Sequence, residues 1–413
     1  MFVHPELGYF DEREDLTAAK LYAPSRLAIG KARGLPPIAF RSKVFADLED
    51  EKIWTRSWVF VGALDQIPES GDLLPYTIGH HGLHVQRTTG GDLVGRFNKA
   101  QHGGCRAVPA QCQTGIKTKC SFTSCGYSRD RDVIPSSELG EDTPAMRQYL
   151  GEQPDRLLSA RVESFGPFVH ASLDRAAPSL EAELGPVAEH MAPYAKAKLR
   201  GVAGFWAEHQ CNWKLAGRAF MDQAEVPHMA PVAAKRGAKP KSAAVAHGAR
   251  FVAREIGLSG VEGDLPVLAT LDEKARMGAT LIWSFPNLLI AALPDHVVTI
   301  GLQPTSFSST MHRVRLYVGF GAKGVTAEHP GIIKRLDFWR ALLARIGERS
   351  KAEQLETMRW GTPSLPATAG KKRPIETSDY GYHFQRFLID RLLAEHDYYW
   401  AGPLTDARIG HGP

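Results

Sequence analysis

Three apolar runs in the second half of the chain most constrain its fold. The runs ATLIWSFPNLLIAAL, HVVTIGLQP and HRVRLYVGF lie within residues 278–320, and turn-forming residues separate them. Short apolar runs of this kind are typical of consecutive strands. The stretch that follows, HPGIIKRLDFWRALLARIG, has the apolar spacing of a helix. We therefore predict an α+β domain that contains an antiparallel sheet followed by a helix.

The first half of the chain predicts a smaller β lobe. Residues 44–57 have helical spacing, and the alternating runs DLLPYTI and GLHVQRTTGGDLVGRFN follow, with Thr-Gly-Gly-Asp as a hairpin turn. The stretch LLSARVESFGPFVHASLD supplies strands that close the lobe. Helical patterns cover 178–198 and 206–229, and the basic stretch 231–254 is interpreted as a solvated loop. The expected domains are an N-terminal segment, 1–43, that packs on the large domain, a β lobe, 44–160, and an α+β domain, 161–413.

Composition excludes several classes of function. The chain has 413 residues, of which 43% are hydrophobic, so it has enough apolar mass for a sizeable core. A net charge of +5 is too small to indicate nucleic-acid binding. The sequence has neither a secretory signal at its start nor a run of about 18 apolar residues that would cross a membrane. These features predict a soluble, cytoplasmic protein with no nucleic-acid or membrane partner.

The cysteines are concentrated in one short stretch. Within residues 97–130 lie four of the five, with His102 beside them: Cys105, Cys112, Cys120 and Cys125. Clustered thiols in a reducing cytosol are more often metal ligands than disulfides, and a metal would order loops this poor in apolar residues. We therefore predict a metal site. Plain reduced thiols and a Cys105–Cys125 disulfide are the alternatives.

Two segments carry a family resemblance. The order hairpin, FN-x-x-x-H-G-G and C-x-F-x-x-C-G-Y-S-x-D, together with CNWKLAGRAFMDQAEVPHMAP further on, resembles the large (alpha) subunits of Rieske non-heme iron ring-hydroxylating oxygenases. The resemblance runs from about residue 40 to ETMRWG and YGYHFQRFLIDRLL near the end. It implies a small β Rieske-like lobe inserted in a larger, helix-grip-type, catalytic-like domain with an antiparallel sheet.

The Rieske-like segment departs from the family's ligand pattern. A Rieske cluster takes two cysteines and two histidines, in a Cys-x-His and a Cys-x-x-His loop. Here His102 and Cys120 remain, but the other two positions fall on Ala100 and Thr123. We therefore expect a rebuilt site: a structural Zn²⁺ held by the four thiolates, or by three of them and His102. A [2Fe–2S] cluster with altered ligands is the less favoured alternative.

The mononuclear iron segment departs as well. The family's two histidines and one carboxylate fall on Glu225, Ala230 and Lys351. We therefore expect no mononuclear iron and predict no catalytic residue. Asp222 matches the aspartate that bridges neighbouring subunits in the family, which makes it an interface candidate. A metal held by Asp222, Glu225 and His228 is a weaker reading, because Pro227 interrupts the helix that would align them.

Together these departures predict a non-catalytic accessory subunit. Such a chain would join a catalytic Rieske oxygenase paralogue in a trimer-based hetero-oligomer, and ferredoxin and reductase would act through that partner. The family resemblance alone implies an aromatic or steroid-like substrate for the complex. The alternatives are an active oxygenase with atypical ligands and a stand-alone ligand-binding protein.

Overall fold

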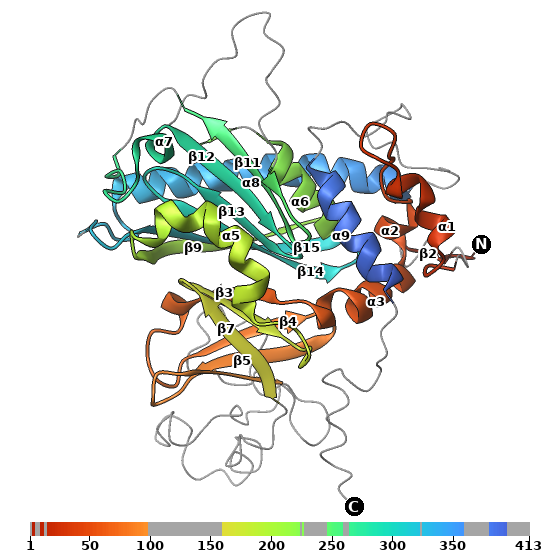
Figure 1. The fold of residues 1–413 in the computed structure, drawn as a ribbon, viewed down its shortest axis with the longest axis horizontal. Helices are drawn as coiled ribbons and strands as arrows, with labels where there is room; N and C mark the ends of the chain where they lie inside the picture. The colour runs from red at the N-terminus through yellow and green to blue at the C-terminus, as the bar shows by residue number, and fades with distance from the viewer. Residues whose placement is uncertain are drawn as a thin grey trace, which may run out of the picture. The chain divides into compact units, whose positions relative to one another are not determined.

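The computed structural model describes the following residues: 2–4, 9–11, 15–97, 159–223, 225–226, 246–258, 264–322, 324–358 and 380–394. They form helices and antiparallel sheets, which confirms the α+β class (Figure 1). The chain divides into two compact units, one made of Met1–Ile53 with Glu181–Ala394 and the other centred on Trp54–Leu180. The domain boundaries that the sequence predicts after residues 43 and 160 stay predictions.

A seven-stranded antiparallel sheet forms the centre of the larger unit. Its order is β10-β11-β12-β13-β14-β15-β9. The strands are β9 (Leu199–His209), β10 (Ala246–His247), β11 (Phe251–Gly257), β12 (Gly278–Ser284), β13 (Leu288–Ala292), β14 (Val297–Ser306) and β15 (Ser309–Gly319). The apolar runs within 278–320 are confirmed as β12–β15, and the first of them turns at residues 285–287 to give two strands.

Two sequence predictions near this sheet are wrong. Residues 206–209 belong to β9 and not to a helix, because β9 pairs along its length with β15, a partner more than a hundred positions away. The basic stretch 231–254 is not a solvated loop throughout. Its last part enters β10 and β11, since Arg254 pairs in register with Leu281 of β12.

Helices cover both faces of the sheet. One face carries α6 (Trp213–Asp222), α8 (Pro330–Met358) and α9 (Gly381–Leu393) (Figure 1). On that face Trp283 of β12 stacks on Phe384 of α9, with ring centroids 4.2 Å apart. The other face carries α5 (Leu180–Ala195), whose Tyr194 hydroxyl donates to the Ala292 carbonyl at 3.2 Å. The helices predicted at 178–198 and after residue 328 are thus confirmed.

The N-terminal segment of the larger unit adds short elements. They are β1 (Phe2–His4), β2 (Tyr9–Asp11), α1 (Ala19–Tyr22), a 3₁₀ turn (Ala23–Arg26), α2 (Ile38–Arg41) and α3 (Lys43–Lys52). α3 begins at Ser42, whose hydroxyl accepts a hydrogen bond from the Phe45 amide at 3.2 Å, as an N-cap should. Arg41 of α2 donates to the Thr357 carbonyl near the end of α8 at 3.1 Å. A four-residue helix, α7 (Glu273–Arg276), precedes β12.

The smaller unit is a six-stranded antiparallel sheet. Its order is β3-β8-β7-β6-β5-β4, with short 3₁₀ turns at Trp54–Arg56 and Leu64–Gln66. The strands are β3 (Val59–Ala63), β4 (Leu73–Ile78), β5 (His81–Arg87), β6 (Leu93–Phe97), β7 (Ser159–Phe165) and β8 (Phe168–Ser172). The predicted hairpin is confirmed: β5 and β6 pair from Arg87 opposite Leu93, and Gly91 in the turn has a φ of +87° that favours glycine.

Candidate functional site

The residues predicted to bind metal in the Rieske-like segment lie outside the described residues. These are His102, Cys105, Cys112, Cys120 and Cys125, and the same holds for Ala100, Thr123, Pro227, His228 and Ala230. Among the residues that the structure does describe, no group of three or more His, Cys, Asp or Glu side chains could hold a metal ion. The cysteine in the described part is Cys211, a buried free thiol. Zinc and [2Fe–2S] therefore stay predictions.

The start of α6 is fixed by Asn212. Its side-chain oxygen accepts from the Lys214 amide at 3.1 Å and so caps the helix, while its amide nitrogen donates to the Phe307 carbonyl at 2.7 Å. The backbone N–H of Asn212 donates to Gln354 of α8 at 3.0 Å. Because the side chain and the backbone are both held, the first turn of α6 has a defined position against α8.

Lys214, two residues later, forms a buried ion pair with the N-terminal segment. Its ammonium lies 2.7 Å from Glu49 of α3, and the exposed fractions of the two side chains are 2% and 3%. The other oxygen of Glu49 accepts from the Trp213 indole at 3.2 Å. Burial raises the pKa of Glu49 and lowers that of Lys214, and the opposite charge of each partner acts against that shift. The Asn-Trp-Lys segment therefore joins α6 to α3 and α8, which is a structural role.

The end of α6 carries two of the positions predicted from the resemblance. Asp222 is the last residue of the helix and is half-buried. Glu225 follows it, is exposed, and accepts a hydrogen bond from the Arg345 guanidinium of α8 at 2.5 Å. Arg254 of β11 donates to the carbonyls of Met221 and Gln223 at 3.0 and 2.9 Å, so it caps the carboxyl end of the helix. The side chains of Arg254 and Arg345 thus hold the carboxyl end of α6 and the residues that follow it.

Lys351, the third position, lies half-buried on α8. A 2-His-1-carboxylate site needs neutral imidazoles and a carboxylate that is free to bind Fe²⁺. Glu225 offers a carboxylate that a guanidinium already engages, and Lys351 offers a cation. These two residues do not fit the iron site of the family. Ala230 lies outside the described residues, and its sequence identity supplies no donor atom.

Ion pairs connect α6 and α8 beside these positions. Arg218 of α6 pairs with Glu353 of α8, and Arg349 lies 3.8 Å from the same carboxylate. The Glu225–Arg345 pair lies beyond the end of α6 and eight residues earlier on α8. Sequence reasoning missed the arginines on α8, because helical spacing places them on the polar face without showing what they meet. Charge pairs therefore link the two segments that the family's iron ligands would occupy.

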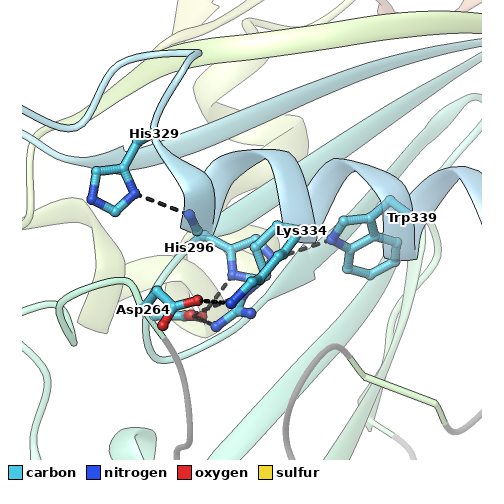
Figure 2. A network of polar contacts seen from close by, with 8 residues as sticks. Asp264, His296, His329, Lys334 and Trp339 are labelled. Carbon is cyan, nitrogen blue, oxygen red and sulfur yellow. Dashed lines mark hydrogen bonds and ion pairs between the residues drawn. The ribbon is translucent and has the colours of Figure 1, made fainter.

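A second polar cluster lies at the other end of α8, where His296 and Trp339 are labelled in Figure 2, and its members are buried: Asp295, His296, Arg335 and Trp339. Asp295 accepts from Arg335 at 2.6 Å and from the His296 ring at 2.6 Å, and His296 accepts from the Trp339 indole at 3.1 Å. Burial opposes ionisation of Asp295, but His296 and Arg335 outweigh it and lower its pKa to about 2. The chain of contacts joins the β13–β14 turn to α8. It anchors the helix and exposes no reactive group.

Comparison with known proteins finds a similarity to one family over part of the chain. Residues 196–336 match the family model described as ring hydroxylating alpha subunit (catalytic domain). Over 195 residues the chain is 28% identical to the N,N-dimethyl phenylurea N-demethylase subunit alpha of Sphingobium sp. (strain YBL2), which covers 45% of this chain and 41% of that protein. It is 27% identical over 191 residues to the biphenyl 2,3-dioxygenase subunit alpha of Rhodococcus jostii (strain RHA1), covering 45% and 40%. The chain thus spans less than half the length of these curated relatives.

Solved structures share the fold over most of the chain. A naphthalene 1,2-dioxygenase variant bound to phenanthrene superposes with a TM-score of 0.64 at 14% identity, covering 97% of this chain and 100% of that one. A quaternary ammonium Rieske monooxygenase gives a TM-score of 0.61 at 15% identity, covering 91% and 98%. The family model over residues 196–336, the curated relatives and the shared fold agree that this chain is similar to the large (alpha) subunits of ring-hydroxylating oxygenases.

Proposed function

We propose that this chain is a non-catalytic accessory subunit of a heteromeric Rieske-type oxygenase. The observation that carries the proposal is that the residues at the predicted iron positions do not fit Fe²⁺. Glu225 binds Arg345 and Lys351 supplies a cation, at positions where the family pattern requires donors to Fe²⁺. Without that iron, this chain would have no centre at which to activate dioxygen by itself.

The maintained core supports a role in assembly. The capped start of α6, its buried ion pair with α3 and its capped end are all present around the altered positions. Because the fold is maintained around the altered positions, we infer that its surface binds other chains. The partner would be a catalytic large subunit of the same family in a trimer-based hetero-oligomer, and ferredoxin and reductase would deliver electrons to that partner. Asp222 is the residue we propose for the interface.

The cysteine cluster would serve the same role if it holds Zn²⁺. Cys105, Cys112, Cys120 and Cys125, with His102 as an alternate ligand, would order the segment they lie in without redox chemistry. Metal analysis and an absorption spectrum of the purified chain test this part. A colourless protein with one zinc per chain is the expected result. A brown protein with iron and sulfide contradicts it and would make this chain an electron carrier.

Co-expression with a catalytic large subunit of the same family tests the main proposal. We expect the two chains to co-purify, and NADH-coupled O₂ uptake with ferredoxin and reductase to need the partner. The variant Asp222→Asn should weaken co-purification, whereas Asp337→Asn, at an exposed α8 carboxylate paired with Arg340, should not. O₂ uptake by this chain alone would establish an oxygenase with atypical ligands. A homo-oligomer that never retains the partner would refute the accessory role.

Restoring the lost ligands tests the structural reasoning. The triple variant Glu225→His, Ala230→His and Lys351→Asp supplies two imidazoles and one carboxylate at the three positions. We expect it to retain Fe²⁺ at about one ion per chain after dialysis, whereas the parent chain retains none at this site. Equal iron in both proteins would show that these three positions are not where the iron site has been lost.

A further inference from the structure

Two histidines face each other between the sheet and α8. His209 ends β9 and His312 lies on β15. In the register of these strands His209 is opposite Thr310, so His312 is its diagonal neighbour on the same face. The two ring centroids are 4.4 Å apart and the ring planes are inclined by 54°. The rings therefore form one compact pair.

The backbone of α8 lies directly against this pair. Gly347 is the residue of α8 at the contact, and a Cβ added there would collide with the His209 ring. Because Gly347 has no side chain, this turn of α8 can lie close to the His209 imidazole. The long helix thus rests on the histidine pair in its second half and on the Asp295 cluster in its first half.

Within the described residues, three of the pair's four ring nitrogens lack the hydrogen bonds that would support a positive charge. His312 is buried, and within the described residues neither of its ring nitrogens has a hydrogen-bond partner; the buried Nε2 of His209 has none either. A protonated imidazole carries two N–H donors, and each needs an acceptor when it is buried. This environment therefore accepts two neutral rings and opposes a charge on either of them.

Few charged groups act on the pair from its surroundings. His209 acts on His312 and lowers its pKa further, and Glu348 of α8, which is exposed, acts on His209 in the opposite sense. The Cys211 thiol, beside Ser350 of α8 and near Glu353, is buried and its pKa is raised to about 12. Burial is the main cause that lowers the pKa of both histidines, and Glu348 offsets only part of it for His209.

We propose that His209 and His312 form an acid-sensitive switch that controls the packing of α8 on β9 and β15. At neutral pH both rings are uncharged and the helix is seated. On acidification a proton on either ring lacks an acceptor, and a second proton adds repulsion at close range. Separation of α8 from the sheet gives the rings water as a partner. The same movement would release Arg345 and Glu353, which hold Glu225 and Arg218.

The direction and size of the effect follow from proton linkage. A histidine in the open form titrates near its ordinary pKa of about 6.5, and in the closed form it stays neutral to lower pH. The open population is therefore lowest above that value and grows as the pH falls below it. Between pH 7.5 and 5.5 it should rise about tenfold for each histidine that titrates, and about a hundredfold for both.

Hydrogen exchange of the full chain, corrected for the intrinsic pH dependence, tests the switch. We expect peptides covering 340–354 of α8 to exchange at least tenfold faster at pH 5.5 than at pH 7.5, while peptides of α5 do not. The variants His209→Gln and His312→Gln remove the titrating groups and should each reduce that ratio, to near one when combined. If His312→Gln does not fold, the half-buried His209→Gln alone still gives the comparison.

His190→Gln on α5 is the matched control. It removes another histidine whose ring lies 5.5 Å from an aromatic ring, that of Phe251, on the opposite face of the sheet. This variant should keep the parent's acid response in α8. An α8 exchange rate that does not respond to pH in the parent chain overturns the proposal. An acid response of equal size in the His209→Gln chain and the parent overturns it as well.

Discussion

Removing one partner of the Glu49–Lys214 pair should destabilise the larger unit strongly. Lys214→Met leaves a carboxylate that is 3% exposed next to a thioether, and Glu49→Gln leaves an ammonium that is 2% exposed. Loss of one member of a buried ion pair costs about 3–5 kcal/mol, since the remaining charge has been taken out of water without its partner. Lys214 also lies 5.4 Å from each of the rings of Phe40, Phe45 and Trp213, so no water replaces the lost partner there.

The neighbouring helix residues supply a matched control. Lys43 and Asp47, also in α3, are 2.7 Å apart, the same separation as the buried pair, but their exposed fractions are 56% and 44%. Because solvent screens an exposed pair, Lys43→Met should cost at most about 0.5 kcal/mol. The two lysine variants therefore differ in burial and not in the length of the contact.

Urea unfolding followed by circular dichroism measures the difference. We expect a large fall in the midpoint for Lys214→Met and for Glu49→Gln, and almost none for Lys43→Met. The double variant Glu49→Leu with Lys214→Met replaces both charges by apolar groups and should recover most of the loss. Equal midpoints for Lys214→Met and Lys43→Met would refute the reasoning, since burial would then carry no penalty for the orphaned carboxylate.

Three further predictions concern single sites. Burial lowers the pKa of His84 to about 3 and of His170 to about 4. The free energy of unfolding of the smaller unit should therefore be highest above pH 6.5, and below that pH each histidine should reduce it by up to about 1.4 kcal/mol per pH unit. Urea midpoints at pH 7.5 and pH 5 measure this effect. Gly217→Ala places a methyl against the Trp283 ring and should cost about 1–3 kcal/mol, whereas Gly185→Ala in α5 meets nothing within 4 Å and should not destabilise; thermal melts decide. Arg335→Met removes the guanidinium from the buried Asp295 carboxylate and leaves it the His296 ring. This variant should lower the unfolding midpoint clearly, against no change for the exposed Lys334→Met.

None of the helices in the described part of the chain is long and apolar enough to span a membrane.

The helices pack on the sheet through aromatic contacts such as Trp283 on Phe384 and through the buried cluster at Asp295. These contacts explain why α8 and α9 lie on the same face although more than twenty residues separate them along the chain.

The sequence alone determined the elements whose signal is local. Strands β12–β15, the β5–β6 hairpin and the helices α5 and α8 follow from apolar spacing and turn residues that lie within a few positions of one another. The prediction that Glu225 and Lys351 stand at altered iron positions also came from the sequence, through the family resemblance. Each of these inferences needs only neighbouring residues or a pattern along the chain.

Tertiary structure decided everything that depends on a distant partner. β9 was mistaken in part for a helix because its strand identity comes from pairing with β15. Arg345 on Glu225, Lys214 on Glu49 and the ring pair His209–His312 each join residues more than a hundred positions apart. The free energy of a charge or an imidazole depends on its burial and on the groups that surround it in space. Periodicity along the chain reports which face a residue occupies, but it does not report what that face meets.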